Sequence, residues 1–264
     1  MKAMLKRSIT GTRLEPLLRR MHGYVGSQPI VAHLQARLGD KSRLYDLQTL
    51  QVMQKQLKPD GSCIDVGCHR GAIMKEMVAL APGGDHWGFE PLPDLFTGLV
   101  ELFADNPHVH LRPEALSDAE GSATFQHVVD QPGYSGFRKR RYDSSVTRTV
   151  EIKVRMARLD ELIPDNQSID LIKIDVEGAE LQVLRGAERL IRRCKPVIVF
   201  EHGLGAADHY GTEPEHIYDL MTGYGLAIGL MGDWLAGRRD KVFSREAFGE
   251  EFRQARNFYF IAFA

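Results

Sequence analysis

The sequence predicts an α/β fold in which helices cover both faces of a mostly parallel sheet. From Ser62 onward, short apolar runs alternate with segments of helical periodicity, as in "SCIDV", "GAIMKEMVAL" and "HWGFE". Strands that alternate with helices in this way are joined by right-handed crossovers, which place successive strands parallel in one sheet. Glycine, proline and acidic residues separate the segments, where connections between elements are expected.

Residues 1–60 are expected to form a helical extension that precedes a domain at 61–264. In "SRLYDLQTLQVMQKQL" a helical stripe recurs every three residues, at Leu44, Leu47, Leu50 and Met53. The segment at 59–61, "PDG", then ends the helix. The basic, apolar start lacks the continuous apolar core of a signal peptide. A helix packed on the domain is favoured over a segment lying on a membrane, and it could also join two copies into a homo-oligomer.

The elements of the domain follow one another in a regular order. Strands are expected at "SCIDV", "HWGFE", "VHLRPEAL", "IDLIKID" and "PVIVFE", with a final pair at "LAIGLM" and "NFYFIAF". Helices lie between them, including one continuous helix from Ala179 to Arg193. An inserted antiparallel hairpin is expected at about residues 121–156, because "GSATFQHVV" and "RTVEIKVRMARL" alternate like strands. Its polar tip is typical of a loop that covers a site.

Composition limits the classes of function. With 34 basic and 35 acidic side chains, the chain offers no electrostatic basis for general nucleic-acid binding. Its 3 cysteines form no CxxC pair and no zinc-binding spacing, which predicts a reduced, cytoplasmic protein. No apolar run reaches about 18 residues, so stable membrane insertion is not expected.

Polar residues follow each strand of the predicted parallel sheet, at the edge where such sheets bind ligands. They are "DVGCHRG" after the first strand, Glu90 after the second, Glu114, Ala115 and Leu116 after the third, Asp175 and Glu177 after the fourth, and Glu201 and His202 after the fifth. Because the carboxyl ends of parallel strands meet at one edge, these residues are expected to form one site.

The glycine turn after the first strand indicates a nucleoside cofactor. Gly67 and Gly71 open a helix, where the backbone can come close to a ligand and unpaired N–H groups are available. Glu90 can accept hydrogen bonds from both hydroxyls of a ribose. Asp65 stands where a dinucleotide-binding fold carries its first glycine, and its charge would repel a phosphate. A cationic ligand, such as an amino group or a sulfonium, is therefore favoured.

These motifs resemble those of the FkbM-type S-adenosylmethionine-dependent methyltransferases. The similar blocks run from about Ser62 to His202 and are "IDVGCHRG", "GFEPLPDLF", "EALSDAEGSATF", "ARLDEL" and "IDLIKIDVEGAELQVLRGAERLI", followed by "KPVIVFE". The resemblance implies a class I, Rossmann-like methyltransferase fold with seven strands, the last of them antiparallel. It also implies O-methyl transfer to a hydroxyl of a sugar, glycoside or specialised metabolite, as in natural product biosynthesis.

The resemblance also assigns roles to the residues at the strand ends. The cofactor loop would comprise Asp65, Gly67, Cys68, His69 and Gly71. Glu90 would hold the ribose, and Glu114, Ala115 and Leu116 would flank the adenine. Asp175 would face the methionine end, close to the reacting methyl group. Cys68 and His69 depart from the small residue and Asn that members of the family usually carry there.

An aliphatic hydroxyl is a poor nucleophile, so a general base or a metal ion is expected to assist the transfer. His202 is the first candidate base, and Asp175 and Glu177 are further catalytic candidates. Alternatively, Asp175 and Glu177 could bind Mg²⁺ together with Glu201 and His202, although separately hydrogen-bonded carboxylates are the simpler interpretation. Glu180 is expected to be structural, because an acidic residue suits the first turn of a helix.

Two other functions remain open at this point. A metal-dependent glycosyltransferase could use "DVE" as its cation motif, but Asp65 argues against a sugar nucleotide diphosphate at the first loop. A non-catalytic scaffold could retain the same fold. It would be expected to have lost its cofactor residues, and here they are present.

Overall fold

The computed structural model describes residues 41–139 and 148–264. The chain divides into two compact units, Met1–Thr49 and Leu50–Ala264. Of the expected helical extension, residues 1–40 lie outside the described part, and helix α4 (Ser42–Gln56) begins in the first unit and ends in the second. The description that follows concerns the second unit.

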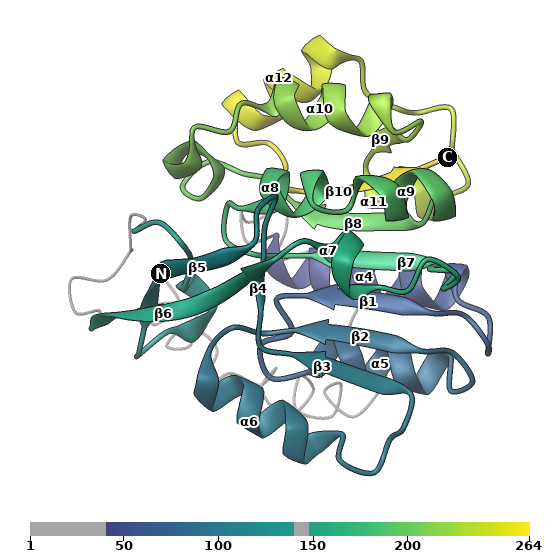
Figure 1. Ribbon diagram of the computed structural model, residues 1–264. Coiled ribbons are helices and arrows are strands. Elements are labelled where there is room, and N and C mark those ends of the chain that lie inside the picture. Colours follow the sequence, from purple (N-terminus) through teal and green to yellow (C-terminus); the bar gives the residue numbers. More distant parts are fainter. Residues whose placement is uncertain (1–40, 140–147) are drawn as a thin grey trace, which may run out of the picture. The chain divides into compact units, whose positions relative to one another are not determined.

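The main sheet has seven strands in the order β3-β2-β1-β7-β8-β10-β9 (Figure 1). They are β1 (Cys63–Val66), β2 (His86–Phe89), β3 (Val109–Arg112), β7 (Leu171–Ile174), β8 (Val197–Glu201), β9 (Ala227–Gly229) and β10 (Tyr259–Phe263). Strands β3, β2, β1, β7 and β8 run parallel, and β10 runs antiparallel to both β8 and β9. The expected class I sheet with a final antiparallel pair is thus confirmed.

Helices pack on both faces of the sheet. Their bounds are α5 (Ala72–Leu80), α6 (Pro93–Leu102), α7 (Leu159–Leu162), α8 (Glu180–Arg185), α9 (Glu188–Cys194), α10 (Pro214–Gly223), α11 (Met231–Leu235) and α12 (Arg245–Arg253). On one face, Ile64 and Ile172 share a hydrophobic core with residues of α8, α9, α10 and α12. Helix α5 lies on the other face, where Met74 comes close to Gly88 of β2. Figure 1 shows α6 beyond the β3 edge and α10 and α12 beyond the β9 edge.

Strand alternation explains how two charged residues enter the buried sheet. In the parallel register, Asp65 of β1 lies directly opposite Lys173 of β7, while Ile64 lies opposite Ile172. Successive residues of a strand point to opposite faces, so the isoleucines enter the apolar core and the two charged side chains share the other face. The two charged side chains therefore lie together on the opposite face of the sheet and do not enter the apolar core.

The inserted hairpin is present and belongs to a second, three-stranded sheet. Strands β5 (Gly121–Val128) and β6 (Thr149–Ala157) pair antiparallel, and β6 also pairs parallel with β4 (Ala115–Leu116). The segment expected to form the third strand is consequently split, because β3 ends at Arg112 and Pro113 follows. Phe125 and Val154 pack on Leu92 and Ala115. This contact brings the hairpin against the strand ends of the main sheet.

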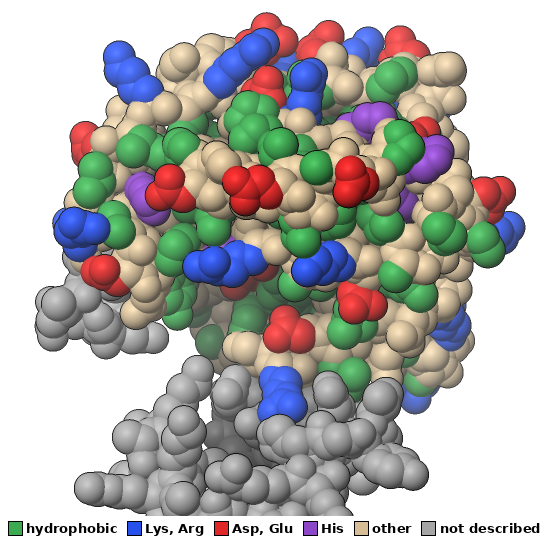
Figure 2. Space-filling view, turned by 90° about the horizontal axis from the view of Figure 1, so that it is seen from below, with side chains coloured by type: hydrophobic (Ala, Val, Ile, Leu, Met, Phe, Trp, Pro, Cys, Tyr) green, Lys and Arg blue, Asp and Glu red, His purple; other side chains and the backbone are tan. Residues whose placement is uncertain are grey.

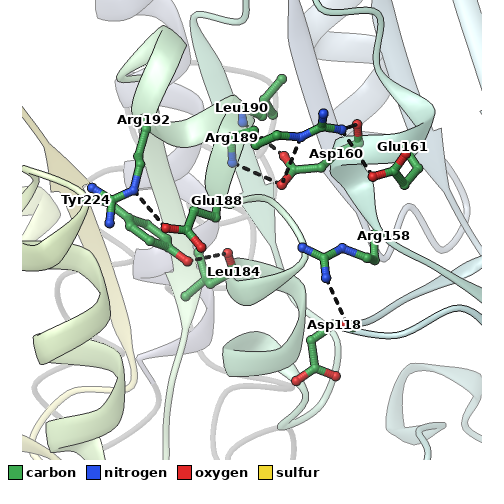
Figure 3. A network of polar contacts seen from close by, with 10 residues as sticks. All are labelled: Asp118, Arg158, Asp160, Glu161, Leu184, Glu188, Arg189, Leu190, Arg192 and Tyr224. Carbon is green, nitrogen blue, oxygen red and sulfur yellow. Dashed lines mark hydrogen bonds and ion pairs between the residues drawn. The ribbon is translucent and has the colours of Figure 1, made fainter.

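The expected helix from Ala179 to Arg193 is two helices, α8 and α9, separated at Gly186. A Cβ at Gly186 would lie 2.1 Å from the carbonyl oxygen of Ser117, so only glycine fits there. The carbonyl of Gly186 accepts a hydrogen bond from the backbone N–H of Asp160. The Asp160 carboxylate in turn accepts the backbone N–H groups of Arg189 and Leu190 at 3.0 and 2.9 Å, which caps α9 (Figure 3).

The surface on the α6 side mixes side chains of all kinds. Figure 2 shows acidic, basic and hydrophobic side chains interspersed among the described residues of this face. Within residues 41–139 and 148–264, no helix combines the length and the apolar character needed to cross a membrane.

Candidate functional site

A cavity of about 310 Å³ lies at the carboxyl edge of the main sheet. Its walls come from the loop after β1, the ends of β2 and β7, strand β4 and the hairpin. The predicted site residues that line it are Asp65, Gly67, Cys68, His69, Glu90, Glu114, Ala115, Leu116, Asp175 and Glu177. The structure therefore brings together residues that lie more than a hundred positions apart in the sequence.

The two loop glycines serve different contacts. A Cβ at Gly67 would lie 2.0 Å from the carbonyl oxygen of Asp175, so this glycine lets the loop after β1 pack directly on the loop after β7. Gly71 does not line the cavity; it begins α5 with a φ of 76°, and a Cβ there would lie 2.8 Å from Leu99 of α6. Both have a positive φ, which favours glycine. Gly71 thus positions the loop through helix packing.

Glu90 is held by the backbone on both sides. One carboxylate oxygen accepts the N–H of His69 at 2.8 Å and the other accepts the N–H of Leu92 at 3.0 Å. Burial raises the pKa of Glu90 to about 7, against the effect of these two hydrogen bonds. The carboxylate is therefore fixed in orientation at the cavity wall, with remaining lone pairs available to a ligand.

Lys173 is the centre of a buried ionic group that sequence reasoning left without a role. Its ammonium lies 3.7 Å from Asp65 Oδ1 and 3.3 Å from Asp175 Oδ2, and it donates to the carbonyl of Gly67 at 3.3 Å. Burial opposes the charge of Lys173, but the carboxylates of Asp175 and Asp65 outweigh it and raise its pKa. In the sequence, Lys173 stands out as a lysine inside an otherwise apolar strand. The structure places it opposite Asp65 in the parallel register.

Asp65 has an unusual environment for a carboxylate. Its side chain is 1% exposed, and neither oxygen has a hydrogen-bond partner within the described part of the chain. Burial raises its pKa, although the nearby Lys173 ammonium lowers it. The Lys173 ammonium, 3.7 Å from Oδ1, offsets part of the cost of burial, but a buried carboxylate whose lone pairs accept no hydrogen bond remains costly. It therefore fits a ligand that brings positively charged or hydrogen-bonding groups into the cavity.

Three carboxylates gather beyond the ends of β7 and β8. One oxygen from each of Asp175, Glu177 and Glu201 lies within 4.8 Å of the others. Burial would raise the pKa of Asp175, but the Lys173 ammonium and the hydrogen bond from Tyr259 help to lower it overall. The Tyr259 hydroxyl donates to Asp175 Oδ2 at 2.6 Å. No sequence pattern pointed to Tyr259, which approaches Asp175 only because β10 inserts beside β8.

His202 does not join these carboxylates. Its imidazole is 1% exposed and stacks on Phe252 and Phe248, with ring centroids 4.7 and 5.9 Å away. Neither ring nitrogen has a hydrogen-bond partner among the described residues, and burial lowers the pKa of His202 to about 4. Glu201 and His202 are consecutive at a strand end, so their side chains point to opposite faces. Of the predicted base and cation ligands, Asp175 and Glu177 line the cavity and Glu201 lies close to them, whereas His202 does not.

The loop after β7 is held in a strained conformation. Glu177 has a φ of 60°, and the neighbouring Gly178 has a φ of 109°, where a Cβ would lie 2.6 Å from the carbonyl oxygen of Ala206. Glu180 accepts the N–H groups of Val176 and Gly178 at 3.2 and 3.0 Å, which supports its expected structural role. Non-glycine residues at positive φ are uncommon, and they persist where the surroundings hold them. His69, on the opposite wall, is also at positive φ.

Comparisons with known proteins identify the family to which the chain is similar. The model of the FkbM methyltransferase domain family matches residues 65–226. Over 223 residues the chain is 26% identical to the AMB antimetabolite synthetase AmbE of Pseudomonas aeruginosa, a match that covers 70% of this chain and 10% of AmbE. Over 158 residues it is 28% identical to the 2-O-methyltransferase NoeI of Sinorhizobium fredii, covering 55% of this chain and 65% of NoeI.

A further relative is the hexuronic acid methyltransferase AglP of Haloferax volcanii. It is 24% identical over 221 residues, which cover 81% of this chain and 82% of AglP. The family match spans more than half of the chain and includes the loop after β1, Glu90 and the carboxylates after β7. The chain therefore belongs to the FkbM family of methyltransferases.

Proposed function

We propose that this protein binds S-adenosylmethionine in the cavity and transfers its methyl group to a hydroxyl of a small acceptor. The proposal depends on one observation: two buried carboxylates, Asp65 and Glu90, line the same cavity, and backbone N–H groups hold Glu90 in one orientation. A ribose diol suits Glu90, and the cationic methionine end suits Asp65.

In this proposal the cavity holds the cofactor along its length. Glu90 accepts the ribose hydroxyls, and the buried side chains of Ala115 and Leu116, beside Glu114, flank the adenine. The methionine end lies toward Asp65 and Asp175. With the methionine end there, the methyl group would be available to an acceptor that approaches the carboxylates beyond β7.

Asp175 is the group we expect to meet the acceptor hydroxyl. The Lys173 ammonium and the Tyr259 hydroxyl keep it ionised, so it can accept a hydrogen bond from the hydroxyl and align its oxygen with the methyl group. Glu177 is a second catalytic candidate on the cavity wall. Carboxylate oxygens as close as those of Asp175, Glu177 and Glu201 also suit Mg²⁺, which is a variable to test in the assay.

The relatives support a sugar or a specialised metabolite as the acceptor. NoeI is named a 2-O-methyltransferase, AglP a hexuronic acid methyltransferase and AmbE an antimetabolite synthetase. The chain spans 65% of NoeI and 10% of AmbE, so the acceptor of the whole protein is a proposal. A cytoplasmic location and assembly through the N-terminal segment are likewise proposals.

The test is calorimetric titration with S-adenosylmethionine, NAD and UDP-glucose. We expect saturable binding of S-adenosylmethionine alone, and its loss in Glu90→Ala, because that variant removes the fixed ribose acceptor. The matched control is Glu101→Ala, an exposed glutamate on α6 away from the cavity lining. Binding of UDP-glucose instead would support the glycosyltransferase alternative. Failure to bind any of the three ligands would favour a scaffold.

A further inference from the structure

Tyr259 reaches the site from the far end of the chain. It is the first residue of β10, opposite Glu201 of β8 in the antiparallel register. Its hydroxyl donates to Asp175 Oδ2 at 2.6 Å, across 84 positions of sequence. Asp175 lines the cavity, so this tyrosine touches the cavity wall through a carboxylate.

Two donors meet on the same oxygen of Asp175. The Lys173 ammonium lies 3.3 Å from Oδ2, and the Tyr259 hydroxyl lies 2.6 Å from it. They come from different strands, β7 and β10, so the carboxylate is held between them. An O–H group that donates to a carboxylate makes a charge-assisted hydrogen bond, which is short and about twice as strong as a neutral one.

The fold does not require this hydroxyl to hold β10 in place. Backbone ladders already join β10 to β8 and β9 along the strand. Two other tyrosine hydroxyls donate to backbone carbonyls, that of Tyr218 to Phe243 and that of Tyr224 to Leu184. The Tyr259 hydroxyl instead donates to a side chain of the cavity wall.

We propose that Tyr259 is a positioning residue for methyl transfer, which with Lys173 holds the Asp175 carboxylate in one orientation toward the acceptor hydroxyl. This inference rests on the proposed function. In the reaction, the acceptor oxygen bonds to the methyl carbon as the carbon–sulfur bond breaks, and that electron pair stays on sulfur to give a neutral thioether. The hydroxyl proton passes to Asp175 and then to solvent. A protonated ether is a strong acid, so even a weakly basic carboxylate can accept this proton.

The experiment is Tyr259→Phe, which keeps the ring and removes the hydroxyl. We expect kcat to fall about 10- to 100-fold, as for the loss of a hydrogen bond to a charged group, while the affinity for S-adenosylmethionine is unchanged. The acidic limb of the kcat/KM profile should move to higher pH, because Asp175 would protonate more easily. The control is Tyr218→Phe, whose hydroxyl bonds a backbone carbonyl; it should leave kcat and the profile unchanged.

A double-mutant cycle distinguishes positioning from packing. If Tyr259 acts through Asp175, adding Tyr259→Phe to Asp175→Asn should cost little beyond the single Asp175→Asn change. Incorporation of 3-fluorotyrosine at 259 is the second variant, because it preserves packing; its more acidic phenol should move the acidic limb to lower pH. Unchanged kcat and an unchanged profile in both variants would overturn the inference. Absence of methyl transfer in the wild-type protein would instead contradict the proposed function.

Discussion

At the scale of single residues, His202 shows how a buried imidazole links stability to pH. Its ring lies between Phe248 and Phe252, and burial lowers its pKa from 6.5 to about 4, although Glu215 opposes this shift. In the unfolded chain the imidazole takes up a proton below its ordinary pKa, whereas in the folded protein it does not. His202 therefore stabilises the fold above pH 6.5, and this contribution is lost as the pH falls toward 4.

We expect the free energy of unfolding to fall by up to about 3 kcal/mol across this interval through His202 alone. Urea unfolding of the wild type and of His202→Phe at pH 7.5 and 5 would measure the difference between the two proteins. The comparison with the variant is needed because Glu90 and Glu180 change the stability of both proteins in the opposite direction. Burial raises their pKa values to about 7, so they stabilise the fold as the pH falls. A wild type that loses no more stability than the variant would refute the prediction.

The sequence could identify the site residues near the strand ends, but not those that reach the site only through distant tertiary contacts. Asp65, Glu90 and Asp175 were predicted because Asp65 lies near the carboxyl end of an apolar strand and the other two follow such strands directly. Tyr259 could not be predicted, because its contact depends on the placement of β10. His202 was expected beside Glu201, but consecutive residues at a strand end point to opposite faces, so only Glu201 lies near Asp175 and Glu177.

At the scale of secondary structure elements, the junction between α8 and α9 depends on one carboxylate. Asp160 is 6% exposed, and its two oxygens accept the N–H groups of Arg189 and Leu190 (Figure 3). The first N–H groups of a helix have no partner within it, so Asp160 satisfies groups that α9 would otherwise leave buried. Arg189 also donates to the backbone carbonyl of Asp160 at 2.7 Å, which closes the contact in both directions.

Replacing this cap, in Asp160→Ala, should lower the free energy of unfolding by about 1–2 kcal/mol. Amide hydrogen exchange should accelerate first in α9, because the loss is local to its N-terminus. Asp165→Ala, an exposed aspartate a few residues later, is the control and should leave both measurements unchanged. Equal exchange rates in α9 of wild type and Asp160→Ala would show that the cap is not needed.

Element boundaries were harder to predict than element types. The apolar stripe of the predicted helix continues from Leu184 to Ile191, so periodicity alone gave one helix, and Gly186 was the signal of a break. Its cause is distant in sequence, since the Ser117 carbonyl occupies the space that a side chain would need. In the same way, Pro113 signalled the end of β3, but only the pairing of β4 with β6 explains it.

At the scale of the whole domain, the cavity forms where the second sheet meets the main one. The parallel sheet could be predicted from the βα alternation, because right-handed crossovers join parallel strands. The parallel pairing of β4 with β6 could not be predicted, because it joins segments about 40 residues apart and no local sequence pattern indicates it. As a result the hairpin provides one wall of the cavity, with Phe125 and Phe137 in edge-to-face contact at 5.3 Å.

This placement makes the hairpin a part of the cofactor site, and Phe137 tests that role. Phe137 packs on the cluster of Ala115 and Phe125, beside the residues expected to flank adenine. Phe137→Ala removes an aromatic wall, so affinity for S-adenosylmethionine should fall about 5- to 30-fold, which corresponds to about 1–2 kcal/mol of lost contact.

The measurement is calorimetric titration together with thermal unfolding of the unliganded variant. Phe137 is only partly buried without a ligand, so the loss of affinity should exceed the loss of stability. Val150→Ala, an exposed apolar residue of β6 at 45% exposure, is the matched control within the same hairpin and should bind as the wild type does. If Phe137→Ala binds S-adenosylmethionine with wild-type affinity, the hairpin does not form the adenine wall. The second sheet would then act on the acceptor side or on stability alone.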